Sequence, residues 1–304
     1  GGHLLSFDLK SEKFEDLAIA PHNEGILSMN MDTQRGDIYG ITWPSGYFFR
    51  FNIYKKKMHS LGPVSGQGEN GSGIEYRTLC RSIAINPDNG FVYYTTSDGA
   101  IFCCKPDLDL AEPLHDDDLK KDYFGHYDPT SPGHMGYNWR QVFWHPEKKL
   151  FYGVHGNSGY LFTFDPINNQ VEMLNRLTSL PSQRSGMFDQ FSYGYLGFAL
   201  GPDQKVIYYL TGAPLFNEGR RVVGKLKTAK GEAKGLEYLH LITYDISSCQ
   251  YLDHGPIFFN NGQYPLYVNS IAIGLDGMIY FLGRITENGI ARTDLISIPN
   301  PLKK

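Results

Sequence analysis

Hydrophobic and polar residues alternate with a period of two over many short segments of this chain. The segment 160–165, Tyr-Leu-Phe-Thr-Phe-Asp, is typical, and turn-forming residues stand at both of its ends. Alternation over about four to eight residues between such turns predicts a half-buried β-strand rather than a helix. We therefore expect an all-β chain built from many short strands.

These strands recur as a repeated unit. The segment 153–165 (GVHGNSGYLFTFD) has a near copy at 40–52 (GITWPSGYFFRFN), and looser copies occur at residues 94–105, 209–245 and 281–299. Each unit runs from an apolar strand through a polar turn to a strand rich in Tyr and β-branched residues, then to an alternating strand and an edge strand. Four antiparallel strands that recur several times along a chain are typical of the blades of a β-propeller.

Five such units are legible in the sequence. Their inner strands begin near Ile26, Cys80, Tyr137, Tyr195 and Val268. Residues 3–19 precede them and are expected to form the third and fourth strands of a further blade, whereas the last unit shows three strands. We therefore predict one β-propeller domain over residues 1–304, with five blades and an N-terminal half blade. Either the chain belongs to a longer, seven-bladed ring or its two termini share a blade.

The balance of charge argues against two classes of partner. Charged residues make up 20% of the 304 residues, and the formal net charge is −4. A weakly acidic chain gives no reason to expect nucleic acid or an acidic membrane as partner. No stretch approaches the roughly 18 consecutive apolar residues of a transmembrane helix. The sequence opens on Gly1-Gly2-His3 without a charged and apolar leader, so we expect any signal peptide to be already removed or never present.

The four cysteines are Cys80, Cys103, Cys104 and Cys249, and no two of them form a CxxC pair. Cys103 and Cys104 are adjacent on a predicted strand, so they point to opposite faces and cannot form a simple local bridge. We expect buried, reduced thiols rather than a disulfide framework or a zinc site.

Two segments exceed the length of the repeat. Residues 107–137 lie between the outer strand of one blade and the inner strand of the next, and residues 213–237 lie between the second and third strands of their blade. In an up-and-down blade both connections emerge on the same face, because each follows an even number of strands. We therefore expect both insertions at one mouth of the central channel, since long loops on a rigid scaffold often carry function.

The inner strands begin closest to the axis at this mouth, and none of their first residues is a carboxylate. A glycoside hydrolase needs two acids there, so their absence counts against that class, although the loop residues Glu75 and Asp189 can still reach in. The mouth is expected to hold hydrogen-bond donors and titratable bases instead: Arg81, His134, Tyr137, Asn138, Arg140, His155, Tyr193, Tyr195, Arg220, Arg221 and Tyr264. Such a set on a net-acidic chain indicates an anionic ligand, because Arg binds carboxylate or sulfate in a bidentate manner.

His155 and His134 are the two candidates for proton transfer. His155 ends a second strand within Gly-His-Gly-Asn-Ser-Gly, a context expected to leave the imidazole uncrowded, and His134 enters the channel just before an inner strand. A histidine in a cleft is a candidate for function, and the alternative for each is a turn or surface histidine. His126 joins them in a less favoured interpretation as a zinc site, but the spacing matches no standard motif.

Other candidates have purely structural alternatives. Arg81 is equally compatible with an ion pair between blades, and Arg220 and Arg221 with solvated charge in a loop rich in Lys and Gly. Tyr193 and Tyr195 alternate along one strand, so only one of them can face the channel while the other packs between blades.

Four motifs stand out beside the blade pattern: 133–142 (GHMGYNWRQV), 153–156 (GVHG), 193–203 (YGYLGFALGPD) and 209–212 (YLTG). Together they resemble the seven-bladed β-propeller polysaccharide lyases that cleave ulvan, a sulfated uronic-acid polymer. The resemblance implies that His134 and His155 are the two histidines of the site. It also implies that the tyrosine is Tyr193 or Tyr195, and that the arginine facing the uronate carboxylate is Arg220 or Arg221. A secreted or periplasmic location and the absence of any cofactor are implied as well.

The residue types suit β-elimination from a uronate. A proton leaves the carbon next to the carboxylate, and the glycosidic oxygen leaves the neighbouring carbon. Because that proton is weakly acidic, a cation or hydrogen-bond donors must stabilise the enolate-like transition state. A neutral His, or a Tyr whose pKa is lowered by nearby cations, can take the proton, and Tyr or His can return one to the leaving oxygen.

The leading hypothesis is therefore a lyase that acts on an anionic, uronic-acid-containing polysaccharide. The alternative is a non-catalytic propeller that binds an acidic glycan or a protein through the same face, since the fold alone cannot choose between them. A hydrolase or a metal-dependent lactonase is weakened by the lack of acids at the strand starts.

Overall fold

The structure is a computed structural model that describes residues 1–121, 128–130, 136–156, 158–185, 197–214, 216–218, 220–221, 237–265, 267–287 and 289–303. The chain divides into two compact units. One unit comprises residues 1–151 and 164–171, and the other comprises residues 152–163 and 172–304.

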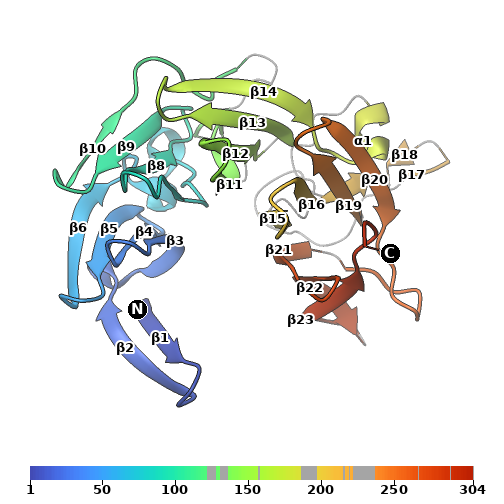
Figure 1. The fold of residues 1–304 in the computed structure, drawn as a ribbon, viewed down its shortest axis with the longest axis horizontal. Helices are drawn as coiled ribbons and strands as arrows, with labels where there is room; N and C mark the ends of the chain where they lie inside the picture. The colour runs from blue at the N-terminus through green and yellow to red at the C-terminus, as the bar shows by residue number, and fades with distance from the viewer. Residues whose placement is uncertain are drawn as a thin grey trace. The chain divides into compact units, whose positions relative to one another are not determined.

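Antiparallel sheets form almost all of the regular structure (Figure 1). The first four-stranded sheet has the order β3 (Gly25–Asp32), β4 (Asp37–Trp43), β5 (Tyr47–Asn52), β6 (Lys57–Pro63). The second has the order β7 (Ala84–Ile85), β8 (Val92–Thr95), β9 (Ile101–Lys105), β10 (Leu110–Pro113). The third runs β11 (Trp139–His145), β12 (Leu150–His155), β13 (Tyr160–Asp165), β14 (Gln170–Arg176). The fourth runs β15 (Gly197–Leu200), β16 (Val206–Pro214), β19 (Glu237–Asp245), β20 (Gln250–Pro256).

Two smaller sheets stand at the ends of the sequence. Strands β1 (His3–Asp8) and β2 (Lys13–Ile19) form a two-stranded sheet. Strands β21 (Tyr267–Ile273), β22 (Met278–Glu287) and β23 (Ile290–Pro299) form a three-stranded one. The remaining elements are short: the hairpin β17 (Phe216–Asn217) and β18 (Arg220–Arg221), helix α1 (Leu180–Ser185), and the 3₁₀ helices η1 (Pro21–Asn23), η2 (Gly68–Asn70) and η3 (Gly73–Glu75).

Neighbouring sheets meet through their innermost strands, as the blades of a propeller do. Strand β7 contacts both β3 and β11 in the first unit, and β15 contacts β21 in the second. This arrangement confirms the predicted all-β propeller, with an incomplete blade at each end of the sequence. That residues 1–304 form a single domain stays a prediction.

The inner strand of the second sheet is shorter than its sequence predicts. The apolar pattern indicates a strand over residues 81–86, whereas β7 pairs with β8 only at Ala84 and Ile85. Ser82, two residues before β7, bonds to the next blade instead. Its carbonyl oxygen accepts the Trp139 indole N–H at 2.7 Å, and its hydroxyl oxygen accepts the Val142 N–H at 3.3 Å.

Aromatic and aliphatic side chains fill the space between the sheets. In the first unit the Tyr93 ring packs edge-on against Phe151 and Phe164, with centroids 5.5 and 5.3 Å apart. In the second unit a core of aliphatic and aromatic residues lies between the last two sheets, and it includes Leu210, Leu241, Val268, Ile279 and Phe281.

All four cysteines are free thiols, so the expectation of reduced cysteines is confirmed. Three of them are buried, but Cys249 is exposed in the turn between β19 and β20. Among the described residues, no helix has the length and apolar character needed to cross a membrane.

Two glycines at equivalent positions of the repeat, Gly40 and Gly153, are explained by the packing of the neighbouring strand. A Cβ atom at Gly40 would lie 2.2 Å from the ring of Phe49, and one at Gly153 would lie 2.4 Å from the ring of Phe162. Both rings are fully buried, so neither can move aside without repacking the core. The glycine is therefore required by the aromatic residue on the next strand.

We expect Gly40→Ala and Gly153→Ala each to lower the free energy of unfolding by about 1–3 kcal/mol, because each overpacks a filled core. Denaturant unfolding measures this loss. Gly25→Ala is the matched control, since a Cβ there meets only one atom, the Trp43 carbonyl oxygen at 3.9 Å. A Gly40→Ala variant as stable as the control would contradict the explanation.

Candidate functional site

The candidate site residues lie at one end of each sheet, where the second strand ends and the third begins. We call this end the insertion end. In the third sheet this end carries the turn 156–159 between β12 and β13 and the end of β14. In the fourth sheet it carries the connection between β16 and β19. The first insertion is shorter than predicted, because its first residues form the outer strand β10 (Leu110–Pro113). The connection from β10 to β11 and the connection from β16 to β19 both leave the insertion ends of their own sheets, as the strand directions predict.

His155 is the last residue of β12, and its side chain is buried with 0% exposed. Its Nδ1 lies 2.7 Å from the hydroxyl of Ser158, which is also buried. The turn closes through a hydrogen bond from the Gly159 N–H to the His155 carbonyl oxygen at 3.1 Å, with Gly159 at φ +67°. The expectation of an uncrowded imidazole is therefore wrong, because this turn brings Ser158 back against the ring.

Two further residues gather around this turn. The guanidinium of Arg176, at the end of β14, lies 5.8 Å from the ring centroid of Tyr160. Its Nε–H donates to the Ser158 carbonyl oxygen at 3.3 Å. We call His155, Ser158, Tyr160 and Arg176 the His155 cluster. Tyr160 and Arg176 were not among the predicted site residues, although both stand at strand ends that the repeat already placed on this side.

The predicted residues at the start of β11 are buried within the protein. Tyr137, Asn138 and Arg140 are 5%, 0% and 8% exposed. The Asn138 amide donates to the Thr78 carbonyl oxygen at 3.0 Å, and its oxygen accepts the Thr95 hydroxyl at 2.9 Å. Asn138 therefore connects the second blade to the third, and its predicted contact with ligand stays a prediction.

Arg81 forms an ion pair at the insertion end of the first two sheets. Its Nη2 donates to Glu69 Oε1 at 2.5 Å, the structural alternative that its sequence position already suggested. A second carboxylate, that of Glu24 just before β3, accepts the Thr42 hydroxyl at 2.6 Å. The insertion ends are therefore less poor in acids than expected, because loop carboxylates take the place of acids on the strands.

The remaining predicted residues divide into three groups. His126, His134, Tyr193 and Tyr195 lie outside the described residues. Arg220 and Arg221 form the backbone of β18, paired with Asn217 and Phe216 of β17. The ring of Tyr264 packs against Tyr238 and Phe258, with centroids 4.8 and 6.1 Å away.

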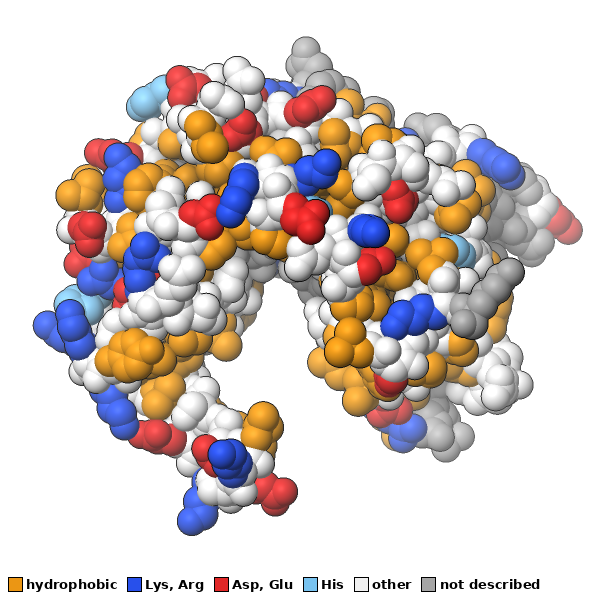
Figure 2. Space-filling view, in the orientation of Figure 1, with side chains coloured by type: hydrophobic (Ala, Val, Ile, Leu, Met, Phe, Trp, Pro, Cys, Tyr) orange, Lys and Arg blue, Asp and Glu red, His pale blue; other side chains and the backbone are white. Residues whose placement is uncertain are grey.

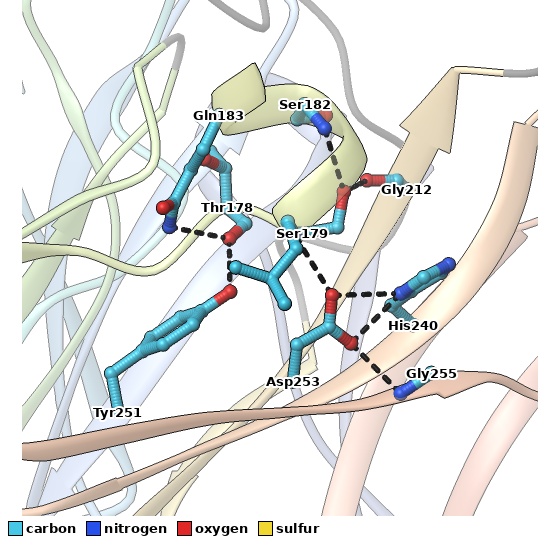
Figure 3. A network of polar contacts seen from close by, with 10 residues as sticks. Thr178, Ser179, Ser182, Gln183, Gly212, His240, Tyr251, Asp253 and Gly255 are labelled. Atoms are coloured by element: carbon cyan, nitrogen blue, oxygen red, sulfur yellow. Dashed lines mark hydrogen bonds and ion pairs between the residues drawn. The ribbon is translucent and has the colours of Figure 1, made fainter. Parts of the chain in front are cut away.

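A polar network supports the segment that follows β14 (Figure 3). The Asp253 carboxylate lies 2.8 Å from His240 Nδ1 and accepts the N–H groups of Leu180 and Gly255, each at 2.8 Å. The Tyr251 hydroxyl donates to the Thr178 carbonyl oxygen at 2.6 Å. The network therefore fixes the beginning of α1 to strands β19 and β20.

The electrostatics of this network are dominated by Asp253. Burial acts to raise the pKa of the Asp253 carboxyl, but the hydrogen bonds from His240, Leu180 and Gly255 hold that pKa below its usual value. No feature of the sequence pattern pointed to His240 or Asp253. The two residues stand on the neighbouring strands β19 and β20, and their contact depends on the register in which these strands pair.

Charge and metal-binding groups are otherwise dispersed. On the face shown in Figure 2, Lys and Arg side chains are interspersed with Asp and Glu and do not gather in a basic patch. Within the described ranges, no group of three or more His, Cys, Asp and Glu side chains is placed to hold a metal ion.

No protein-family model matches this chain, and no curated protein matches it. Solved structures do match. The chain is similar to hydrazine synthase from Kuenenia stuttgartiensis, with a TM-score of 0.58 and 10% identity over 91% of this chain and 63% of that one. It is similar to a putative 6-phosphogluconolactonase from Bacteroides uniformis, with a TM-score of 0.54 and 13% identity over 97% and 77%. The match to TolB from Acinetobacter baumannii has a TM-score of 0.51 and 13% identity over 98% and 57%.

At these identities the likeness shows the β-propeller fold alone. The chain spans only 63% of the hydrazine synthase chain and 57% of the TolB chain. The three neighbours also have unrelated names, so the fold they share does not indicate one activity.

Proposed function

We propose that this chain is a polysaccharide lyase that cleaves a uronic-acid-containing polymer by β-elimination. The observation that carries the proposal is the His155 cluster. The His155 imidazole contacts the Ser158 hydroxyl, the Arg176 guanidinium donates to the Ser158 carbonyl oxygen, and the Tyr160 ring lies beside that guanidinium. An imidazole, a phenol and a guanidinium therefore surround one turn at the insertion end of one sheet. These are the three residue types that the reaction requires.

In the proposed reaction the carbon next to the uronate carboxylate loses its proton to an imidazole or phenolate. The electron pair forms a carbon–carbon double bond, the bond to the glycosidic oxygen breaks, and that oxygen takes up a proton. His155 and Tyr160 supply groups that can accept and donate these protons. Arg176 supplies the positive charge that the developing enolate needs, and preorganised charge of this kind is usually the largest contribution to catalysis.

The family resemblance adds further residues to the proposal. It assigns catalytic roles to His134, to Tyr193 or Tyr195, and to Arg220 or Arg221, and the substrate would be an ulvan-like anionic polysaccharide. The same resemblance suggests a secreted or periplasmic protein that needs no cofactor.

A second candidate is a non-catalytic propeller that binds an acidic glycan or a protein. The burial of His155 favours it, because a catalytic base must reach its substrate.

An absorbance assay decides between the two candidates. The purified chain is incubated with ulvan, polygalacturonate and alginate, and with dextran as a neutral control. We expect the ultraviolet absorbance of an unsaturated uronate to rise with at least one acidic polymer and not with dextran. Binding to an acidic polymer without any rise in absorbance would favour the binding module and contradict the lyase.

A further inference from the structure

Trp43 is the last residue of β4 and is 50% exposed, at the insertion end of the first sheet. Tyr39 and Ile41 lie on the same face of this strand as Trp43, since side chains alternate along a strand, yet both are almost fully buried. Among the other tryptophans, Trp139 is 0% exposed and Trp144 is partly buried. A large aromatic ring is therefore presented to solvent on the side where ligand is expected.

The exposed ring is held in place by a carboxylate. The Trp43 indole N–H donates to Glu69 Oε2 at 2.9 Å, while Glu69 Oε1 accepts Arg81 Nη2 at 2.5 Å and the Leu79 N–H at 3.1 Å. The Glu69 and Arg81 side chains are only 11% and 20% exposed. One largely buried carboxylate thus fixes the edge of the indole beside a guanidinium, and a buried charge-assisted network of this kind is rigid.

The strand that pairs with Trp43 leaves the ring uncovered. Its partner in register is Gly25, the first residue of β3. A Cβ at Gly25 would find only the Trp43 carbonyl oxygen, at 3.9 Å, within 4 Å. The space beside the end of β4 is therefore open on this side.

We propose that Trp43, Glu69 and Arg81 form a saccharide subsite in which a pyranose ring stacks on the indole. A pyranose has an apolar C–H face and a rim of polar groups, and an exposed indole presents an apolar surface of matching size. Arg81 and Glu69 lie at the edge of the indole, where they can bind a sugar carboxylate and hydroxyl groups respectively. Since the ring is already fixed, little conformational entropy is lost on binding.

The inference rests on the proposed function and extends it, because it gives a polymeric substrate a second point of attachment away from the bond that is cleaved. A residue that binds without touching the reacting atoms changes KM and leaves kcat unaltered.

Fluorescence titration with ulvan oligosaccharides tests the subsite. We expect saturable quenching or a shift of tryptophan emission in the wild-type chain, and its loss in Trp43→Phe, because Trp43 is the most exposed of the tryptophans. Calorimetry then compares the variants by Kd. Trp43→Ala is expected to raise Kd about fivefold, since an aromatic contact contributes roughly 1 kcal/mol and 1.4 kcal/mol is a factor of ten. Trp43→Phe keeps a ring and should lose less.

Tyr54→Ala is the matched control. Tyr54 is 74% exposed at the opposite end of the same sheet, in the turn between β5 and β6, so its loss should leave Kd unchanged. A Trp43→Ala variant that binds as tightly as the wild type overturns the subsite, as does a titration in which no saccharide alters the emission.

The two proposals fail separately. If Trp43→Ala cleaves polymer with wild-type KM and kcat, the lyase stands and the subsite falls. If Trp43→Ala loses oligosaccharide affinity in a chain that produces no unsaturated uronate, the subsite stands and the lyase falls.

Discussion

Replacing His155 with alanine is expected to lower kcat by roughly 10²–10⁴-fold on the acidic polymer that is cleaved fastest, because the reaction loses a positioned proton acceptor. The change also deprives the buried Ser158 hydroxyl of a partner 2.7 Å away. The free energy of unfolding should therefore fall by about 1–3 kcal/mol. Initial rates of unsaturated-uronate formation, measured where circular dichroism shows a folded chain, give the kinetic effect.

His145→Ala separates the two consequences. His145 is 2% exposed at the opposite end of the same sheet, and its Nδ1 accepts the Lys148 N–H at 3.2 Å. This control should lose a similar amount of stability and keep its activity. If both variants lose activity in proportion to their stability, or if His155→Ala retains wild-type kcat, His155 has no catalytic role.

Replacing Asp253 with alanine is expected to lower the free energy of unfolding by about 3–5 kcal/mol, because it removes the buried acceptor of hydrogen bonds from His240, Leu180 and Gly255, and each buried donor left unpaired costs about 1–3 kcal/mol. The side chains of His240 and Asp253 are 7% and 3% exposed. Without the acceptor of the Leu180 N–H group, the beginning of α1 also loses its attachment to β20. Denaturant or thermal unfolding measures the loss.

The stabilisation by Asp253 should depend on pH in one direction. Its carboxyl has a lowered pKa in the folded chain, so the folded state holds the ionised form to lower pH than the unfolded state does. The contribution is fully present above the ordinary carboxyl pKa of about 4 and is lost as pH falls through the folded-state pKa. The difference in stability between wild type and Asp253→Ala should therefore narrow below about pH 4.

Asp245→Ala provides the comparison within the same sheet. Asp245 accepts the N–H groups of Ser247 and Ser248 in an exposed turn. Water can replace the carboxylate there, so the loss should stay below about 1 kcal/mol. Equal losses for the two aspartates, or a difference at Asp253 that does not change with pH, would show that the buried pair is not what stabilises this segment.

Part of the candidate site was predictable and part was not. The repeat placed His155 at the end of a second strand and put both insertions at the insertion ends, because strand direction alone decides where a connection emerges. The sequence pattern also anticipated the structural role of Arg81 as one of two alternatives. It did not anticipate Arg176 beside Tyr160, since the two residues stand on different strands and their contact depends on how β13 and β14 pair.

The burial of His155 was likewise not predictable from the sequence. Flanking glycines suggested an open imidazole, yet the positive φ of Gly159 tightens the turn and brings Ser158 onto the ring. A glycine indicates that the backbone is free to adopt a positive φ. It does not indicate which neighbouring side chain occupies the space beside it.

The order of strands, their grouping into blades and the incomplete blade at each end follow from the sequence by itself, because alternation and turn chemistry are local and repeat along the chain. The pairing of Asp253 with His240, of Glu69 with Trp43 and Arg81, and of Asn138 with Thr78 and Thr95 was decided only in the tertiary structure. The hydrogen bonds that make these contacts join residues 12 to 60 positions apart in the sequence. A periodic pattern fixes which face of a strand is buried, and the partner that a polar group finds there depends on the packing of the whole blade.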